Sequence, residues 1–440
     1  MTNLELGFWS FPVLLLLILA RAPIGLAMLL CGGGGLWLAT GSPNMILAKL
    51  KTEPFSAFST YSLSIIPMFL LMGQFATLGG MSTALFRAAE SLLGHRRGGL
   101  GMAAVGACAG FGAICGSSLA TAATMGQVAL PELRRAGWSG GLATATLAAG
   151  GTLGILIPPS VVLVLYAVLT EQNVAKLFMA AFVPGVLATL GYMLVIRLYL
   201  ACHPAEAGTI PRIGWRLRLR ALLAVWPVLA IFLLVVFGIY DGWFTPTEGA
   251  AIGAAGTGLV ALASGRLGWS GLKAAIMATA SGTAMVFFIV LGAAIFNSFL
   301  ALTQVPQTLS AWVIAAGLPP YGVLALILLV YLLLGMVMDS LSMILLTIPI
   351  FFPVMASLDF GLAPEEMAIW FGVLVLIVVE IGLITPPVGM NLFVLAGLDP
   401  DTPVTATYRR VIWFVAADLA RVCLLAAFPA IVLFAIRESA

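Results

Sequence analysis

Long apolar runs recur along the whole sequence, and most of them can cross a lipid bilayer as helices. A membrane-spanning helix needs about 20 predominantly apolar residues. The candidate spans are residues 6–20, 24–41, 60–80, 174–200, 220–240, 247–264, 281–302 and 409–436. Charged residues make up only 8% of the 440 residues, whereas soluble domains carry charge on about 25%. The sequence therefore predicts an all-α, multi-pass membrane protein.

Four further apolar regions are interrupted at their centres. Pro pairs break the regions 139–170 and 366–397. The regions 98–133 and 320–356 are too long for one helix and carry Gly, Ser or Asp at their centres. Irregular backbone at membrane depth is tolerated only where it is buried in protein or lines a water-filled cavity. We therefore expect the functional site in these four regions.

Basic residues orient the chain, because the cytoplasmic connections of membrane proteins are enriched in Lys and Arg. The connections assigned to the cytoplasm carry His95-Arg96-Arg97, Arg134-Arg135, the run from Arg212 to Arg220, Arg266 with Lys273, and Arg409-Arg410. Region 98–133 has basic residues at both ends, so it should enter and leave on the cytoplasmic side as a re-entrant hairpin (hairpin 1). Region 320–356 has non-basic flanks and should re-enter from outside (hairpin 2).

The hairpins and the Pro pairs form an internal repeat. Hairpin 1 carries Gly116-Ser117-Ser118 and is followed by Pro158-Pro159. Hairpin 2 carries Met338-Asp339-Ser340 and is followed by Pro386-Pro387. Broken segments at matching places in two oppositely oriented halves indicate an inverted-topology repeat, an arrangement found in many secondary transporters.

These breaks bring ion-binding groups to the middle of the membrane. Proline lacks an amide hydrogen and disfavours helical backbone in the preceding residue, so each Pro pair frees backbone carbonyls. Free carbonyls with Ser and Thr hydroxyls are suited to Na⁺. Helix N-termini at the hairpin tips attract a carboxylate. The pattern predicts neighbouring sites for a cation and an organic anion.

Acidic residues within the apolar regions have different interpretations. Asp339 lies in a membrane hairpin, where a charge is costly and usually functional. Glu380, two residues before Gly382, is either a support for the ligands or a buried, hydrogen-bonded structural acid. Asp418 and Arg421 are three residues apart in the last span and are expected to form a structural ion pair.

Other classes of function find little support. The sequence contains no GxxxxGK[ST], HExxH or GxSxG pattern, so neither ATP hydrolysis nor a familiar intramembrane hydrolase is indicated. The five cysteines lack metal-binding spacing and are interpreted as packing residues. We expect no enzymatic activity. A channel is a further alternative, which single-channel current would distinguish from a carrier.

Several motifs together resemble the large membrane (M) subunit of tripartite ATP-independent periplasmic (TRAP) transporters, of the DctM type. They occur in order along essentially the whole chain. The motifs are Gly116-Ser117-Ser118, the stretch from Gly150 to Ser160, Thr245-Pro246-Thr247-Glu248, Met338-Asp339-Ser340 and the stretch from Thr385 to Asn391.

The resemblance implies a Na⁺-coupled importer in the bacterial inner membrane. Its substrates would be small organic acids, such as C4-dicarboxylates or sialic acids, delivered by a periplasmic substrate-binding protein. A small four-helix membrane subunit would be a further partner, expected as a separate chain because 440 residues leave no room for its fusion. No nucleic acid is expected as a partner. The alternative is a stand-alone Na⁺/carboxylate or anion symporter of a related inverted-repeat fold.

The resemblance also implies two Na⁺ sites, with substrate between the hairpin tips. The first would involve Ser117, Ser118, Gly151 and Thr152, near the break at Pro158 and Pro159. The second would involve Asp339, Ser340, Thr385 and Gly389, near the break at Pro386 and Pro387, with Asn391 supporting the second tip.

An elevator-type fold is implied as well, in which a scaffold supports a moving transport domain. The expected regions are scaffold helices with an interfacial arm (1–97), the first transport half (98–170), scaffold helices with a basic loop and a second arm (171–319), the second transport half (320–400) and a C-terminal transmembrane helix (401–440).

Overall fold

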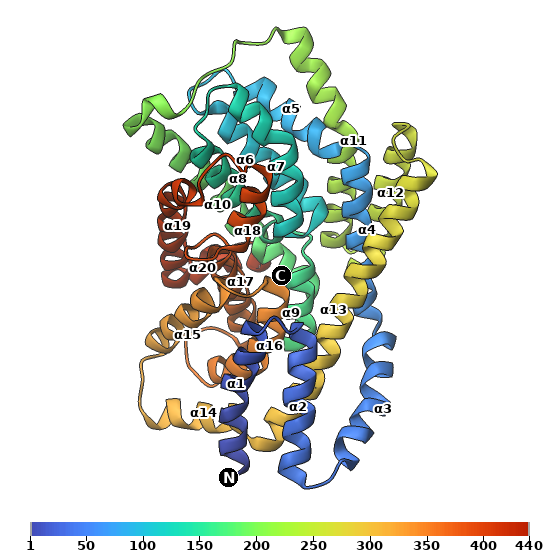
Figure 1. Ribbon diagram of the computed structural model, residues 1–440, viewed down its shortest axis with the longest axis vertical. Coiled ribbons are helices and arrows are strands. Elements are labelled where there is room, and N and C mark those ends of the chain that lie inside the picture. Colours follow the sequence, from blue (N-terminus) through green and yellow to red (C-terminus); the bar gives the residue numbers. More distant parts are fainter. Residues whose placement is uncertain (1, 439–440) are drawn as a thin grey trace.

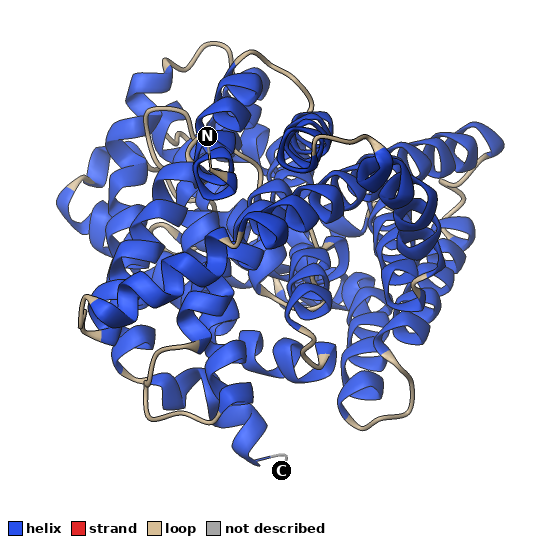
Figure 2. Cartoon of the chain, turned by 90° about the horizontal axis from the view of Figure 1, so that it is seen from below, coloured by secondary structure: helices blue, strands red, loops and turns tan. Residues whose placement is uncertain are grey.

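The computed structural model describes residues 2–438, which form twenty α-helices and two short 3-10 helices without any β-strand (Figures 1 and 2). Among these residues, the segments long and apolar enough to cross a membrane are Tyr61–Leu78, Val174–Cys202, Trp215–Tyr240 and Trp269–Thr303. Two bent helix pairs, Gly140–Leu156 with Val161–Thr170 and Val404–Ala427 with Pro429–Glu438, could add two spans. The predicted all-α membrane fold is confirmed.

One set of helices, the framework group, carries neither hairpin. It consists of α1 (Asn3–Leu19), α2 (Ile24–Thr40), α3 (Asn44–Ser59), α4 (Ile65–Leu78), α11 (Trp215–Tyr240), α12 (Pro246–Ala263) and α13 (Trp269–Thr303). Its most extensive contact joins α2 to α13. A Cβ atom at Gly32 would lie only 2.6 Å from Cα of Phe296, so the glycine lets the two backbones approach closely, as small residues do in membrane helices.

The second set, the hairpin group, contains both hairpins and both Pro-Pro breaks. It consists of α6 (Gly99–Cys115), α7 (Ser118–Arg135), α8 (Gly140–Leu156), α9 (Val161–Thr170), α10 (Val174–Cys202), α15 (Pro320–Gly335), α16 (Ser340–Ala356), α17 (Pro364–Gly382), α18 (Met390–Leu398), α19 (Val404–Ala427) and α20 (Pro429–Glu438). Helix α10 falls in the region expected as scaffold (171–319), yet it packs against α8, α17, α19 and α20. By its contacts it belongs with the hairpins.

Two short helices connect the groups. Helix α5 (Met81–Leu93) packs against α6 and α11, and α14 (Val305–Ala315) packs against α16 and α13. Helix α5 lies in the region 1–97, for which we expect an interfacial arm. Helix α14 lies in the region 171–319, for which we expect a second arm, and it has Pro306 in its first turn, a position that suits proline.

Two further segments differ from the prediction. The candidate spans do not include helix α3, because Lys49, Lys51 and Glu53 interrupt its apolar pattern. Lys49 and Glu53 pair at 2.9 Å along the helix. The C-terminal helix expected over 401–440 is divided into α19 and α20, which meet at 62° next to Pro429. Proline cannot donate the hydrogen bond that a continuous helix would require there.

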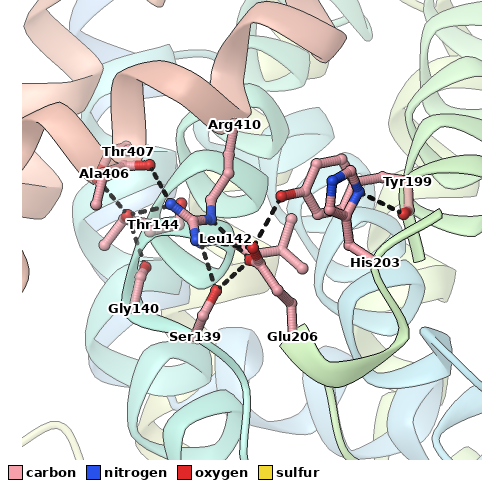
Figure 3. Close-up of polar contacts among 11 residues, drawn as sticks. Ser139, Gly140, Leu142, Thr144, Tyr199, His203, Glu206, Ala406, Thr407 and Arg410 are labelled. Atoms are coloured by element: carbon pink, nitrogen blue, oxygen red, sulfur yellow. Dashed lines mark hydrogen bonds and ion pairs between the residues drawn. The ribbon is translucent and has the colours of Figure 1, made fainter.

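A polar cluster holds one end of the hairpin group together (Figure 3). Glu206, in the connection after α10, accepts hydrogen bonds from Nε and Nη2 of Arg410 in α19, at 2.7 and 2.8 Å. It also accepts from Ser139 Oγ at 2.6 Å and Tyr199 OH at 3.1 Å. Burial alone would raise the pKa of the Glu206 carboxyl, but the hydrogen bonds from Arg410, Ser139 and Tyr199 outweigh it and hold the pKa below its usual range.

Ion pairs also join helices of this group at the opposite end. Lys176 of α10 pairs with Glu365 of α17 at 2.7 Å, and Arg437 of α20 pairs with Glu366 at 2.8 Å. Within residues 2–438, every ion pair between different structural elements lies inside the hairpin group. The contacts with the framework group are made by packing.

Candidate functional site

The two hairpins approach the middle of the molecule from opposite ends. Figure 1 shows α6 and α7 above, and α15 and α16 below. At the first tip, Gly116 adopts φ 63°, a left-handed conformation that glycine accommodates without strain. A Cβ atom there would lie 3.1 Å from the carbonyl oxygen of Pro159. The first tip therefore lies directly against the first Pro-Pro break, and the predicted pair of oppositely inserted hairpins is confirmed.

Glycine contacts repeat in the two halves. In the first half, a Cβ atom at Gly112 of α6 would lie 2.4 Å from Cα of Gly154 in α8. In the second, a Cβ atom at Gly335 of α15 would lie 3.1 Å from Cα of Gly382 in α17. Each contact lies just before a Pro pair. The first helix of each hairpin therefore crosses its broken helix through a matching pair of glycines in both halves.

Each tip ends in a capped helix N-terminus. Ser117 caps α7, accepting a hydrogen bond from the amide of Ala120 at 3.4 Å. Asp339 caps α16, with one carboxylate oxygen accepting from the Ser342 amide at 3.1 Å and the other from its hydroxyl at 2.6 Å. These caps fix both tips, while other amides of the first turns have no partner within their own helix.

Both broken helices resume after their Pro pair as a shorter helix. Helix α8 ends before Pro158, and Ser160 caps α9, accepting from the amide of Leu163 at 3.4 Å. Helix α17 ends at Gly382, and α18 follows Gly389, which has φ 62°. The Pro158–Pro159 and Pro386–Pro387 peptide bonds are both cis.

A small cavity of about 70 Å³ lies between the tips. Its polar lining comes from Gly116, Ser117, Ser118, Asp339 and Ser340, and its wall includes the start of α9 at Val161 and Val162. Leu70 of α4 and Val286 of α13 cover it from the framework group. Four predicted site residues, Ser117, Ser118, Asp339 and Ser340, are thus brought together.

Glu380 joins both tips. It is 1% exposed, and its Oε1 accepts a hydrogen bond from Ser340 Oγ at 2.7 Å and from Ser118 Oγ at 3.5 Å. Its second oxygen, Oε2, is buried and has no hydrogen-bond partner within residues 2–438. The position of this acid in an apolar stretch was its only signal in the sequence; its contact with both serines places it at the candidate site.

Gly151 and Thr152 lie on faces of α8 that pack against neighbouring helices. The Thr152 hydroxyl donates to the carbonyl of Ala149 at 2.7 Å and lies 2.9 Å from Tyr192 OH. Tyr192 in turn donates to Asp418 at 2.6 Å, and Asp418 pairs with Arg421 at 2.7 Å. The predicted ion pair is confirmed, and the Thr152 hydroxyl belongs to its network.

Gly151 faces helix α7. A Cβ atom there would lie 2.7 Å from Cβ of Ala122. The residue therefore permits close packing between the second helix of hairpin 1 and α8.

The second break contacts both halves. Thr385 donates its hydroxyl to the carbonyl of Ile381 at 2.6 Å, and the amide of Gly389 donates to Met336 at the end of α15 at 3.4 Å. The buried Asn391 donates through Nδ2 to the carbonyl of Ala148 in α8 at 3.3 Å. Its Oδ1 has no partner in the described part of the chain. Asn391 therefore connects α18 to the broken helix of the first half.

Pro386 is half-buried, whereas Pro387 is exposed. The carbonyl of Pro387 accepts a hydrogen bond from Tyr408 OH at 2.5 Å. One of the carbonyls at the second break is therefore already bound by a side chain of α19. Pro158 and Pro159, by contrast, are both buried.

Comparison with known proteins identifies the family. Residues 11–431 match the family described as "Tripartite ATP-independent periplasmic transporter, DctM component". The C4-dicarboxylate TRAP transporter large permease protein DctM of Pseudomonas aeruginosa is 38% identical over 86% of this chain and 86% of its own. The sialic acid TRAP transporter large permease protein SiaM of Vibrio cholerae is 30% identical over 94% of each chain.

The fold also has a solved counterpart. The Alcanivorax borkumensis YdaH transporter superposes with a TM-score of 0.62, at 18% identity, over 87% of this chain and 88% of that one. At this identity the likeness concerns the fold. The relatives in sequence are named as permeases, which supports transport and not an enzymatic reaction. This chain belongs to the DctM family, the large permease subunits of TRAP transporters.

Proposed function

We propose that this chain is the transport subunit of a Na⁺-coupled importer of a small organic acid in a bacterial inner membrane. The observation that carries the proposal is the convergence of both hairpin tips and Glu380 around one cavity. Hydroxyls, a carboxylate and helix N-termini meet there. Oxygen ligands suit Na⁺, and the positive ends of helices α7, α9 and α16 suit a substrate carboxylate.

Two cation sites are proposed, as the family resemblance implies. One would involve Ser117 and Ser118 at the cavity, together with Gly151 and Thr152 of α8. The other would involve Asp339 and Ser340 at the cavity, together with Thr385 and Gly389 of the second break. The unpartnered Oε2 of buried Glu380 supports this arrangement, because a buried carboxylate oxygen without a donor is stabilised by a cation.

The substrate is proposed to be a carboxylate. The names of the two relatives, which refer to C4-dicarboxylates and to sialic acid, support this class. Among the described residues, none that lines the cavity has a basic side chain, so a bound carboxylate would be balanced by helix amides and by Na⁺. A cation and an anion placed side by side each reduce the cost of taking the other out of water, which couples their transport.

The hairpin group is proposed to move as one body relative to the framework group. Its helices are joined by ion pairs at both ends, whereas packing dominates its contacts with the framework. Helices α5 and α14 would act as arms between the two. Such a division suits an elevator mechanism, and it places α10, α19 and α20 in the moving body.

The proposed partners are a small four-helix membrane subunit and a periplasmic substrate-binding protein, as the name TRAP transporter implies. The decisive experiment is uptake into proteoliposomes of labelled C4-dicarboxylates and sialic acid, with and without a Na⁺ gradient and each partner. Uptake that requires Na⁺ and the binding protein would support the proposal. Equal uptake by this chain alone would favour a stand-alone symporter, and uptake indifferent to Na⁺ would exclude the proposed coupling.

A further inference from the structure

A second cavity, lined by three arginines, lies away from the candidate site. It has a volume of about 410 Å³ and lies between the start of α6 and the end of α10. Its lining consists of Arg96, Arg97, Met102, Arg197, Leu200 and Ala201. None of the three guanidinium groups takes part in an ion pair within residues 2–438. Three like charges around one cavity repel one another unless an anion lies between them.

The same two helices border an apolar cleft of about 250 Å³ further along their length. Its lining includes Ala109, Gly110 and Ala113 of α6, Val186 and Leu190 of α10, and Phe232 of α11. Almost all of the exposed surface in this cleft is carbon. Gly110 has no side chain to fill it, and the nearest atom to a Cβ there would be Cδ2 of Leu85, at 3.2 Å.

The two cavities are offset by the same distance along both helices. Met102 of the arginine-lined cavity and Ala109 of the apolar cleft are seven residues apart on α6, and Arg197 and Leu190 are likewise seven residues apart on α10. Two turns of helix correspond to about 10 Å along the helix axis. The pattern is therefore a cationic cavity with an apolar cleft about 10 Å below it, on one side of one helix pair.

We infer that this groove binds an anionic phospholipid of the cytoplasmic leaflet. The phosphate would contact Arg96, Arg97 and Arg197, and an acyl chain would occupy the cleft below. Arginine forms bidentate hydrogen bonds with phosphate, and basic pockets between membrane helices on the cytoplasmic side bind anionic head groups. The basic flank His95-Arg96-Arg97 assigns this end of the chain to the cytoplasm.

The lipid would lie where α6 and α10 face α5 and α11. It would therefore fill the boundary between the hairpin group and the framework group. Any effect of this lipid on transport rests on the proposed function, whereas its binding does not. Binding is accordingly measured on the purified protein without an uptake assay.

Native mass spectrometry of the full chain in detergent provides the test, with added phosphatidylglycerol, phosphatidylcholine or inorganic phosphate. The variant Arg96→Gln/Arg97→Gln/Arg197→Gln should lose phosphatidylglycerol binding by a factor on the order of ten or more, since each basic residue near an anionic lipid contributes to binding. Arg212→Gln/Arg216→Gln/Arg220→Gln removes the same charge from exposed positions outside the cavity and should bind like the unmodified protein.

A cleft variant separates a lipid from a free anion. Val186→Trp should fill the apolar cleft and weaken phosphatidylglycerol binding while the arginines remain. Equal binding of phosphatidylglycerol and phosphatidylcholine, or equal losses in both triple variants, would overturn the inference. Binding of inorganic phosphate as tight as that of the lipid, with no effect of Val186→Trp, would show an anion site and would also overturn it.

Discussion

Ser340 Oγ lies 2.7 Å from Oε1 of Glu380, so the tip of hairpin 2 is bound to the helix that precedes the second break. The same oxygen lies 3.5 Å from Ser118 Oγ, at the tip of hairpin 1. One carboxylate oxygen therefore connects three segments that are distant in sequence. The other oxygen has no partner among the described residues, and in the proposed function it supports a bound cation.

Glu380→Gln tests the role of this carboxylate. Glutamine keeps an oxygen that accepts from Ser340 and Ser118, but it removes the charge. We expect the Na⁺ concentration for half-maximal uptake to rise by roughly 10–100-fold, the usual range for losing a group that supports metal ligands. Uptake into proteoliposomes with both partners, measured over a series of Na⁺ concentrations, gives this value. An unchanged Na⁺ dependence would reduce Glu380 to a structural acid.

Asp339 has two roles that two substitutions can separate. Its carboxylate caps α16 through Ser342, so Asp339→Ala should destabilise the tip by about 1 kcal/mol as well as abolish Na⁺-dependent uptake. Asp339→Asn retains a capping oxygen without the charge. We expect near-normal thermal unfolding and loss of Na⁺-dependent uptake for the Asn variant. Normal uptake by Asp339→Ala would remove this residue from the mechanism.

The buried pair Asp418 and Arg421 should matter for stability. Their side chains are 3% and 8% exposed and meet at 2.7 Å. Arg421→Leu leaves the Asp418 charge with only Tyr192 as a partner, and losing one partner of a buried ion pair costs about 3–5 kcal/mol. Asp418→Asn/Arg421→Leu removes both charges and should recover much of that loss. The unfolding temperatures of the unmodified protein, the single variant and the double variant are measured in detergent. Equal unfolding temperatures for all three would refute a stabilising role of this ion pair.

The Glu206 cluster should make stability depend on pH. The native pKa of Glu206 lies below its usual range, so its contribution is present above the unfolded value of about 4.3. It is lost as the pH falls through the native pKa, when the carboxyl is protonated and the contact with Arg410 weakens. Glu206→Gln should therefore lower the unfolding temperature at pH 7, and the difference from the unmodified protein should shrink below about pH 4. A constant difference across this range would contradict the assignment.

The hairpins could be predicted because their evidence is local. Basic residues flank 98–133, non-basic residues flank 320–356, and the Pro pairs mark the breaks. The neighbours of helix α8 could not be predicted in the same way. All of its residues from Gly140 to Leu156 are buried, so no polar face distinguishes one side from another. The contact of the Thr152 hydroxyl with Tyr192 depends on how α10 packs, which the sequence pattern does not contain.

The partition of the helices was also beyond the sequence. An apolar span has the same composition whether it faces lipid, the framework group or a moving body, so the sequence pattern assigns α10 to the scaffold region 171–319. Its contacts with α8, α17, α19 and α20 are long-range. Glu380 could be predicted only in part. Its position in an apolar stretch marks it as unusual, but only the fold brings Ser118 and Ser340 to the same carboxylate oxygen.

Relative motion of the two groups can be tested where α4 meets the tip of hairpin 1. A Cβ atom at Gly73 of α4 would lie 3.2 Å from Sγ and 3.4 Å from Cα of the native Cys115. Gly73→Cys therefore brings two sulfur atoms within reach of a disulfide or a bridging Hg²⁺ ion across the boundary between the groups. Closing this link should stop uptake, because the hairpin group could no longer move past α4, and reduction should restore it.

Two controls separate the link from its side effects. Gly73→Ala adds only the tight Cβ contact, so it measures the cost of the crowding itself. Gly73→Cys/Cys115→Ala keeps the new thiol without its partner and should remain active under oxidation. Cross-linking is measured by peptide mass spectrometry on the same samples used for uptake. Full uptake by a completely cross-linked protein would mean that α4 and hairpin 1 stay together during transport, and the moving body would have to be redrawn to include α4.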